Sequence, residues 1–130
     1  MKLMELQQDF TPDHEAQERG VRLILEEPSR GRIFVLRSDD RIIGMANILF
    51  TIPIAGGGLV ILMEDIVVHP DHRGQGYGSL LLEHVVSFAE TKNFRRITFL
   101  TDKMSPSSQE FFSKPQFEFS HLIPMRRLLA

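Results

Sequence analysis

The spacing of hydrophobic positions changes along the chain from helical to strand-like. Thr11-Pro12-Asp13 has the composition of a helix start, and apolar residues then recur at helical spacing until Pro28. Residues 32–37 and 41–52 are rich in β-forming side chains, and the polar run Ser38-Asp39-Asp40 separates them. The first third of the chain therefore predicts a helix followed by a β-hairpin.

The second half predicts a parallel crossover. Residues 59–68 are apolar on both faces except at Glu64 and Asp65, which is typical of a central strand. Residues 76–91 have helical spacing and lead to a strand at 95–101, so these two strands should be parallel. A short helix at 105–114 and a closing strand at 117–126 complete the order. The fold class predicted is α/β, a mixed antiparallel/parallel sheet with flanking helices.

Composition narrows the function classes. A chain of 130 residues is expected to form one domain, 1–130. A net charge of −2 does not favour a nucleic-acid partner. No apolar run approaches about 18 residues and no signal peptide is recognised, so we expect no membrane association and a cytoplasmic location. The absence of cysteine excludes disulfides, thiolate zinc sites and a cysteine nucleophile.

The segment richest in chemistry follows the 59–68 strand. Arg73 to Gly78 places three glycines at a strand-to-helix junction. Glycines let backbone N–H groups approach a ligand, and a helix N-terminus adds unpaired donors and a positive dipole end. We therefore predict a phosphate-bearing ligand on residues 73–79. The alternative, a tight turn without a ligand, rarely needs alternate glycines beside an arginine. The spacing Gly-x-Gly-x-Gly also differs from the dinucleotide fingerprint.

The pattern Val68-x-Pro70-x-x-Arg73-Gly74-x-Gly76-x-Gly78 resembles the acetyl-CoA-binding motif of the GCN5-related N-acetyltransferases, the GNAT family. The resemblance implies an acyl-CoA N-acyltransferase-like fold, acetyl-CoA as co-substrate, and a pyrophosphate held by the glycine turn. It also implies that the preceding strand pairs its backbone with the pantetheine arm. The residues implied to contact acetyl-CoA are Ile66, Val67, Val68, Arg73, Gly74, Gln75, Gly76, Tyr77, Gly78, Ser79, Ser105 and Phe111.

Two departures from the family pattern bear on activity. Phe112 stands where many members place a tyrosine that protonates the leaving CoA thiolate, and phenylalanine cannot donate a proton. The substrate-facing part before the hairpin is also short, so the N-acetyltransferase domain is shortened at its N-terminus, and a partner subunit of a homodimer could complete the acceptor pocket. The alternatives are a non-catalytic acyl-CoA-binding or regulatory module, and an interaction module whose turn binds nothing.

The implied reaction is direct transfer of an acetyl group to a primary amine of a small molecule or peptide, which requires a neutral amine. Glu64 is the candidate general base or amine-binding carboxylate; the competing interpretation is a structural carboxylate that accepts hydrogen bonds. Neighbouring strand residues face opposite sides, so Glu64 should share a face with Ile66 and Val68, unless a bulge inverts this. Asp65 is interpreted as structural.

The remaining polar residues indicate no metal site. His69 and His72 flank Asp71, but two histidines without a clear third ligand are more typical of a solvated turn.

Tyr77 is expected to pack under the glycine turn. Asn47 on the hairpin could bind an acceptor substrate, although an exposed edge position explains it equally well.

Overall fold

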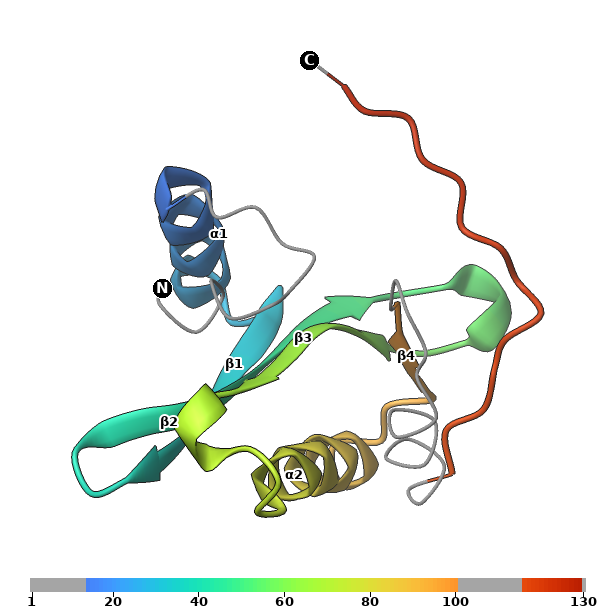
Figure 1. The fold of residues 1–130 in the computed structure, drawn as a ribbon. Helices are drawn as coiled ribbons and strands as arrows, with labels where there is room; N and C mark the ends of the chain where they lie inside the picture. Colours follow the sequence, from blue (N-terminus) through green and yellow to red (C-terminus); the bar gives the residue numbers. More distant parts are fainter. Residues whose placement is uncertain (1–13, 101–115, 130) are drawn as a thin grey trace.

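The structure of the protein is a computed structural model that describes residues 14–100 and 116–129. Figure 1 shows a twisted sheet with helices beside it. In chain order the elements are α1 (His14–Glu26), β1 (Gly31–Ser38), β2 (Arg41–Thr51), the 3₁₀ turn η2 (Ile54–Gly56), β3 (Val60–Val68), the 3₁₀ turn η3 (Pro70–His72), α2 (Tyr77–Thr91) and β4 (Ile97–Phe99).

The four strands form one mixed sheet in the order β1-β2-β3-β4. β1 and β2 form the predicted hairpin, β2 and β3 are also antiparallel, and β3 and β4 are parallel. The helices α1 and α2 lie on opposite sides of the sheet (Figure 1). The predicted fold class, the central place of β3 and the parallel crossover through α2 are confirmed.

The core lies between α2 and the inner strands. Leu81, Leu82, Val85 and Ala89 are the buried residues of α2. They pack against Ala46 and Ile48 of β2 and Ile61 and Met63 of β3, all of which are at most 1% exposed. Gly44 lies directly under the helix, because a Cβ there would be 2.9 Å from Cδ1 of Leu81. Close packing at this point fixes where α2 begins relative to the sheet.

The predicted closing strand at 117–126 is wrong. The described residues 116–129 contain no strand, and nearly all of them are exposed. We call residues 118–125 the C-terminal arm. The pattern of β-forming residues is present there, but the backbone finds no neighbouring strand to pair with in the described residues. The predicted helix at 105–114 and the start of the first helix at Thr11-Pro12 lie outside the described residues.

Within residues 14–100 and 116–129, neither helix has both the length and the apolar character needed to cross a membrane.

Candidate active site

The glycine turn between β3 and α2 has a backbone that only glycine adopts easily. Gly74 has φ 76° and Gly76 has φ 83°, both in the left-handed region. Among the described residues, a Cβ added at either glycine would meet no atom within 4 Å. Backbone conformation, rather than crowding by the described residues, therefore explains these two glycines, and those residues leave the space above the turn open to a ligand.

The turn presents backbone donors at the start of α2. Gly76 is the N-cap of the helix, and Leu80 N–H donates the first helical hydrogen bond to the Gly76 carbonyl at 3.1 Å. The N–H groups of residues 77–79 precede that bond and have no acceptor within the part of the chain that the structure describes. Unpaired donors at the positive end of a helix dipole suit an anion, as the sequence predicts for residues 73–79.

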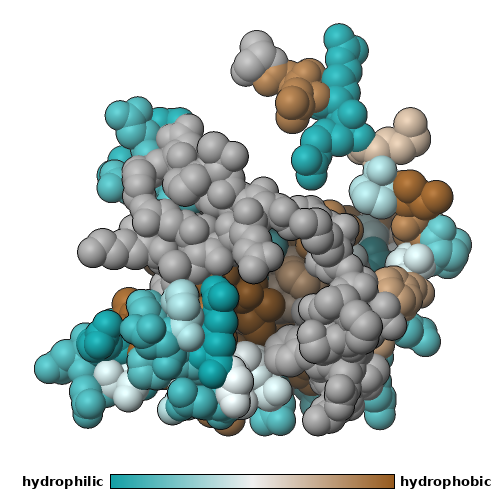
Figure 2. Space-filling model, in the orientation of Figure 1, coloured by the Kyte–Doolittle hydropathy of each residue, from teal (hydrophilic) through white to brown (hydrophobic). Residues whose placement is uncertain are grey.

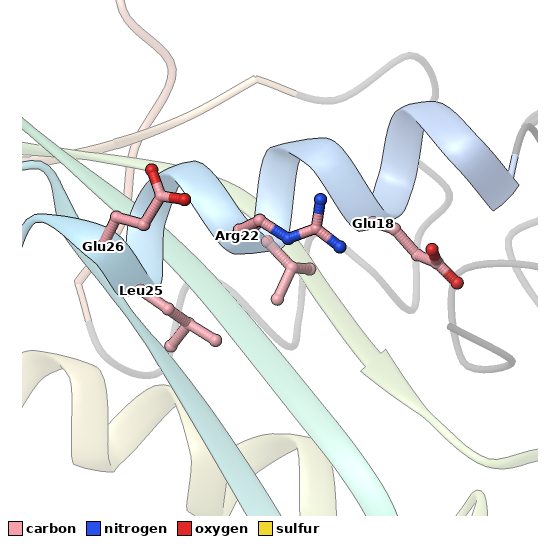
Figure 3. A pocket seen from close by; sticks show the side chains of 5 residues that line it. Glu18, Arg22, Leu25 and Glu26 are labelled. Carbon is pink, nitrogen blue, oxygen red and sulfur yellow. The ribbon is translucent and has the colours of Figure 1, made fainter.

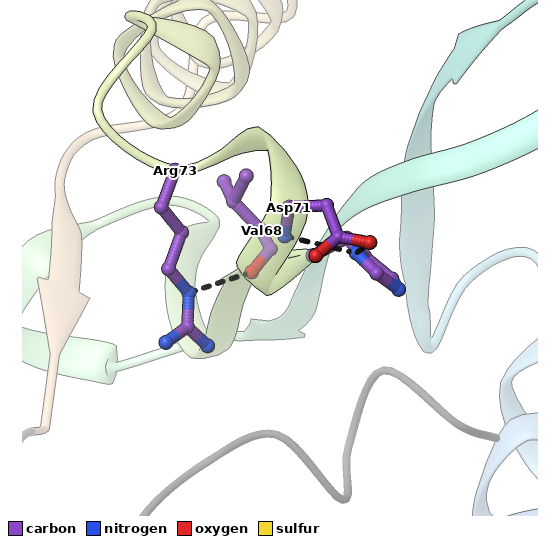
Figure 4. A network of polar contacts seen from close by, with 4 residues as sticks. Val68, Asp71 and Arg73 are labelled. Carbon is purple, nitrogen blue, oxygen red and sulfur yellow. Dashed lines mark hydrogen bonds and ion pairs between the residues drawn. The ribbon is translucent and has the colours of Figure 1, made fainter.

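Side chains brace the approach to this turn. The Arg73 Nε donates to the Val68 carbonyl at 3.0 Å, so the guanidinium lies across the end of β3 (Figure 4). His69 Nδ1 accepts from the Asp71 backbone N–H at 3.2 Å, and the same nitrogen lies 3.7 Å from Asp71 Oδ2. His69 thus caps η3, in line with its interpretation as a turn residue. Within the described residues, no group of three potential metal ligands occurs.

Part of β3 has a free edge. β4 pairs only with Ile61, Leu62 and Met63, so in the described residues no strand lies beside the following five residues on that side. His69 N–H donates to the Ile43 carbonyl of β2 at 2.7 Å. Main-chain groups alternate in direction along a strand, so those of Val68 and Ile66 point to the free edge. The main chain of Val67 points to β2.

A β-bulge lies at Glu64. Asn47 is opposite Asp65 and Ile48 is opposite Met63, which leaves Glu64 as the extra residue. Met63 and Ile66 both pack toward α2, so Glu64 and Asp65 both lie on the face away from α2. The expectation that Glu64 shares a face with Ile66 and Val68 is therefore wrong, and the reason is the inserted residue.

The electrostatics of the bulge favour a protonatable carboxylate. Although the Glu64 side chain is exposed, partial burial raises its pKa, the adjacent Asp65 carboxylate raises it further, and the charge of Arg126 acts in the opposite direction. Asn47 Nδ2 donates to Asp65 Oδ2 at 3.4 Å, while Asn47 Oδ1 is buried without a partner in the described residues. Asn47 lies on an inner strand, so the edge explanation for it is wrong, and it positions Asp65.

The remaining predicted site residues are only partly described. Tyr77 is half-buried, with its ring 6.1 Å from the His72 ring beside the turn. Ser105 and Phe111, predicted to contact acetyl-CoA, and Phe112 lie outside the described residues. A separate hollow lies along α1, lined by Glu18, Val21, Arg22, Leu25 and Glu26 (Figure 3). It includes no residue singled out from the sequence.

The chain is similar to a known protein family and to solved structures. The Acetyltransferase (GNAT) family profile matches residues 1–116. A solved integron cassette protein from the mobile metagenome of Cole Harbour Salt Marsh superposes with a TM-score of 0.84 at 25% identity, covering 99% of this chain and 82% of that one. Among curated protein sequences, no match to this chain was found.

Two further solved structures share the fold. One is the aminoglycoside acetyltransferase meta-AAC0020 from an uncultured soil sample, with a TM-score of 0.77, 18% identity and coverage of 99% and 85%. The other is AAC(6')-Iy bound to a CoA-containing bisubstrate analogue, with a TM-score of 0.79, 22% identity and coverage of 99% and 88%.

The chain belongs to the GNAT family, and its class is therefore that of a GNAT-type N-acetyltransferase. The family resemblance of the glycine turn and the acyl-CoA N-acyltransferase-like fold are confirmed. The roles of the individual residues stay predictions.

Proposed function

We propose that this protein transfers an acetyl group from acetyl-CoA directly to a primary amine of a small cationic molecule. The observation that carries the proposal is the set of backbone donors of residues 77–79, which have no acceptor among the described residues and follow the open turn at Gly74 and Gly76. A diphosphate is the anion that such a turn suits, because several amides and a helix dipole act on it together. In this proposal the domain spans residues 1–130 and works in the cytoplasm.

The free edge of β3 suits the rest of the coenzyme. The pantetheine arm contains amides, and an extended arm with amides can add to an unpaired strand edge. Ile66 and Val68 direct their main-chain groups to that edge. The Arg73 guanidinium donates a hydrogen bond to the Val68 carbonyl. Binding of the pantetheine arm to that carbonyl therefore requires the guanidinium to leave it and turn toward the phosphates.

The chemistry proposed for Glu64 is that of a general base. The amine nitrogen attacks the thioester carbonyl, a C–N bond forms and the C–S bond breaks, with the electron pair leaving on sulfur. The proton lost by the amine passes to Glu64, directly or through water, and the CoA thiolate takes up a proton from solvent. A carboxylate with a raised pKa is better matched to this step than an ordinary one, because its basicity lies closer to neutral pH.

The bulge also supports a cationic acceptor. Because Glu64 and Asp65 lie on one face, two acidic groups meet an incoming molecule where one was expected. Two similar structures are aminoglycoside acetyltransferases, whose substrates are small amines with several positive charges. A homodimer that completes the acceptor pocket is part of this proposal.

A thiol-release assay tests the proposal. The protein contains no cysteine, so a thiol-reactive chromophore detects only the CoA that the reaction frees. We expect release that depends on acetyl-CoA and on an added amine, with polyamines and aminoglycosides above neutral amino compounds. Binding of CoA without release on any amine would instead favour the non-catalytic binding module. Absence of both binding and release would contradict the proposal altogether.

A further inference from the structure

Arg73 covers part of the surface that the proposed function assigns to the pantetheine arm. The Val68 carbonyl points to the side of β3 away from β2, because the next residue, His69, donates its N–H to the Ile43 carbonyl of β2. Arg73 Nε donates to the Val68 carbonyl at 3.0 Å, so its side chain lies across the end of β3 (Figure 4). An amide of the pantetheine arm that pairs with Val68 needs the same carbonyl and the same space.

The chain between Val68 and Arg73 is folded so that the two residues meet. Pro70 begins the 3₁₀ turn η3, His69 is its N-cap, and the Arg73 N–H donates to the Pro70 carbonyl at 3.4 Å. Arg73 itself has an extended backbone, with φ −73° and ψ 154°, and its side chain turns back to β3. The backbone of η3 therefore keeps Arg73 within reach of the Val68 carbonyl, and rotation of one side chain is enough to break the contact.

Arg73 also borders the turn that suits a diphosphate. Gly74 follows it directly, and the N–H groups of residues 77–79 lie at the start of the next helix, α2. Because the Arg73 side chain is exposed, it can rotate without loss of core packing. Guanidinium–phosphate pairs are often bidentate and add an attraction of opposite charges that a carbonyl lacks. The guanidinium can therefore exchange the Val68 carbonyl for a phosphate.

The surface beneath the Arg73 side chain suits an uncharged, partly apolar ligand. Ile66 and Val68 are half-buried and pack against the core. Figure 2 shows apolar side chains at the surface between β3 and α2, next to hydrophilic ones. Pantetheine carries no charge, so apart from these apolar contacts and a few main-chain hydrogen bonds it has nothing with which to displace the guanidinium.

We propose that Arg73 determines which acyl donors bind: its guanidinium covers the Val68 carbonyl in the free protein, and a diphosphate draws it away. This role rests on the proposed function, in which acetyl-CoA occupies both the turn and the edge of β3. A thioester with a diphosphate then opens its own site, whereas an acylated pantetheine without one must break the Arg73 contact unaided. The two halves of CoA are therefore coupled, and each should raise the affinity for the other.

Binding of the two halves of the coenzyme as separate molecules tests this coupling. We expect acetyl-pantetheine, titrated by NMR, to bind the wild type roughly threefold more tightly when ADP is saturating, since exposed charged contacts change affinities by only a few-fold. Arg73→Met should bind acetyl-pantetheine more tightly than the wild type by the same factor without ADP, and ADP should add nothing. Arg37→Met, at an exposed position of β1, is the matched control and should behave as the wild type.

The substitution of Arg73 should act in opposite directions on the two ligands. Arg73→Met should weaken the binding of acetyl-CoA and strengthen that of acetyl-pantetheine, whereas loss of a merely structural residue would weaken both. Equal affinities of the wild type and Arg73→Met for acetyl-pantetheine, or no effect of ADP on the wild type, overturn the role of Arg73 and leave the proposed function standing if acetyl-CoA still binds. If acetyl-CoA does not bind the wild type, the proposed function fails and the role of Arg73 with it.

Discussion

The two halves of β3 differ in almost every physical respect. Ile61 to Met63 is paired on both sides, and Ile61 and Met63 are 1% and 0% exposed in the core under α2. Glu64 to Val68 has a bulge, two carboxylates side by side, and no β4 residue opposite it among the described residues. One strand thus carries a structural half and a half that keeps hydrogen-bonding groups available for a ligand.

The difference shows how a site can be placed on a rigid element. The first half fixes the position of the strand, because its buried side chains interlock with α2. The second half then presents its main chain and acidic groups at a defined place. Substitutions in the first half should reduce stability, and substitutions in the second half should change binding and catalysis.

The largest expected effect is the loss of turnover when Glu64, in the second half of β3, is replaced. Glu64→Gln should lower kcat/KM about 10²–10⁴-fold, the usual contribution of a general base. Since burial and Asp65 raise the pKa of Glu64, the wild-type rate should fall as the pH drops through that raised pKa, and the variant should lose this limb. Glu83→Gln, on the exposed side of α2, is the control. If the rate of Glu64→Gln still fell at low pH as in the wild type, Glu64 would not be the general base.

Substitutions in the first half of β3 should lower the free energy of unfolding. Met63→Ala removes a side chain that is fully buried and should cost about 2–5 kcal/mol of unfolding free energy. Urea unfolding followed by circular dichroism measures this. Leu80→Ala is the comparison on α2, since Leu80 is 52% exposed and should cost far less. Equal losses for the two variants would mean that the core does not lie where we place it.

Backbone strain and ligand binding can be separated in the glycine turn. Gly76→Ala and Gly57→Ala both put a Cβ on a left-handed residue with open surroundings, so each should cost roughly 1–2 kcal/mol of stability. Only Gly76→Ala should weaken acetyl-CoA binding, by at least tenfold, because only that turn faces the proposed diphosphate. Calorimetric titration of both variants with acetyl-CoA measures the two affinities. Equal affinities would argue against the turn as the binding site.

The contribution of Arg73 should be smaller than that of the backbone. Its guanidinium is exposed, and exposed ion pairs contribute at most about 1 kcal/mol, so Arg73→Ala should weaken acetyl-CoA about fivefold. The loss should shrink at high salt. Arg73→Lys should recover part of it, since the charge is kept and the planar fork is lost. Salt-independent loss would point to the Val68 contact instead.

The smallest expected effect is that of the Glu64 carboxylate on the stability of the fold. The pKa of Glu64 is higher in the folded than in the unfolded chain, so its ionised form destabilises the fold above that pKa. This cost disappears as the pH falls below the unfolded value. Glu64→Gln should therefore be slightly more stable than wild type at pH 7 and equal to it in acid. Thermal unfolding at several pH values measures the difference.

Much of the fold could be predicted from the sequence because periodicity and turn residues agree. The hairpin around Asp39, the central strand and the helix after Gly76 follow from local pattern alone. The bulge at Glu64 does not, because one inserted residue leaves the apolar pattern of the strand intact and is visible only in the register with β2. The arm was predicted as a strand from its β-forming residues, yet pairing depends on a partner that local sequence does not specify.

The most direct test of the central claim uses the nine glycines of the chain. A protein labelled with ¹⁵N only at glycine gives a small set of amide signals, which can be followed while CoA is added. We predict saturable shifts at Gly74, Gly76 and Gly78, with Gly20 and Gly57 unchanged. Unmoved signals from the three turn glycines at saturating CoA would contradict the account.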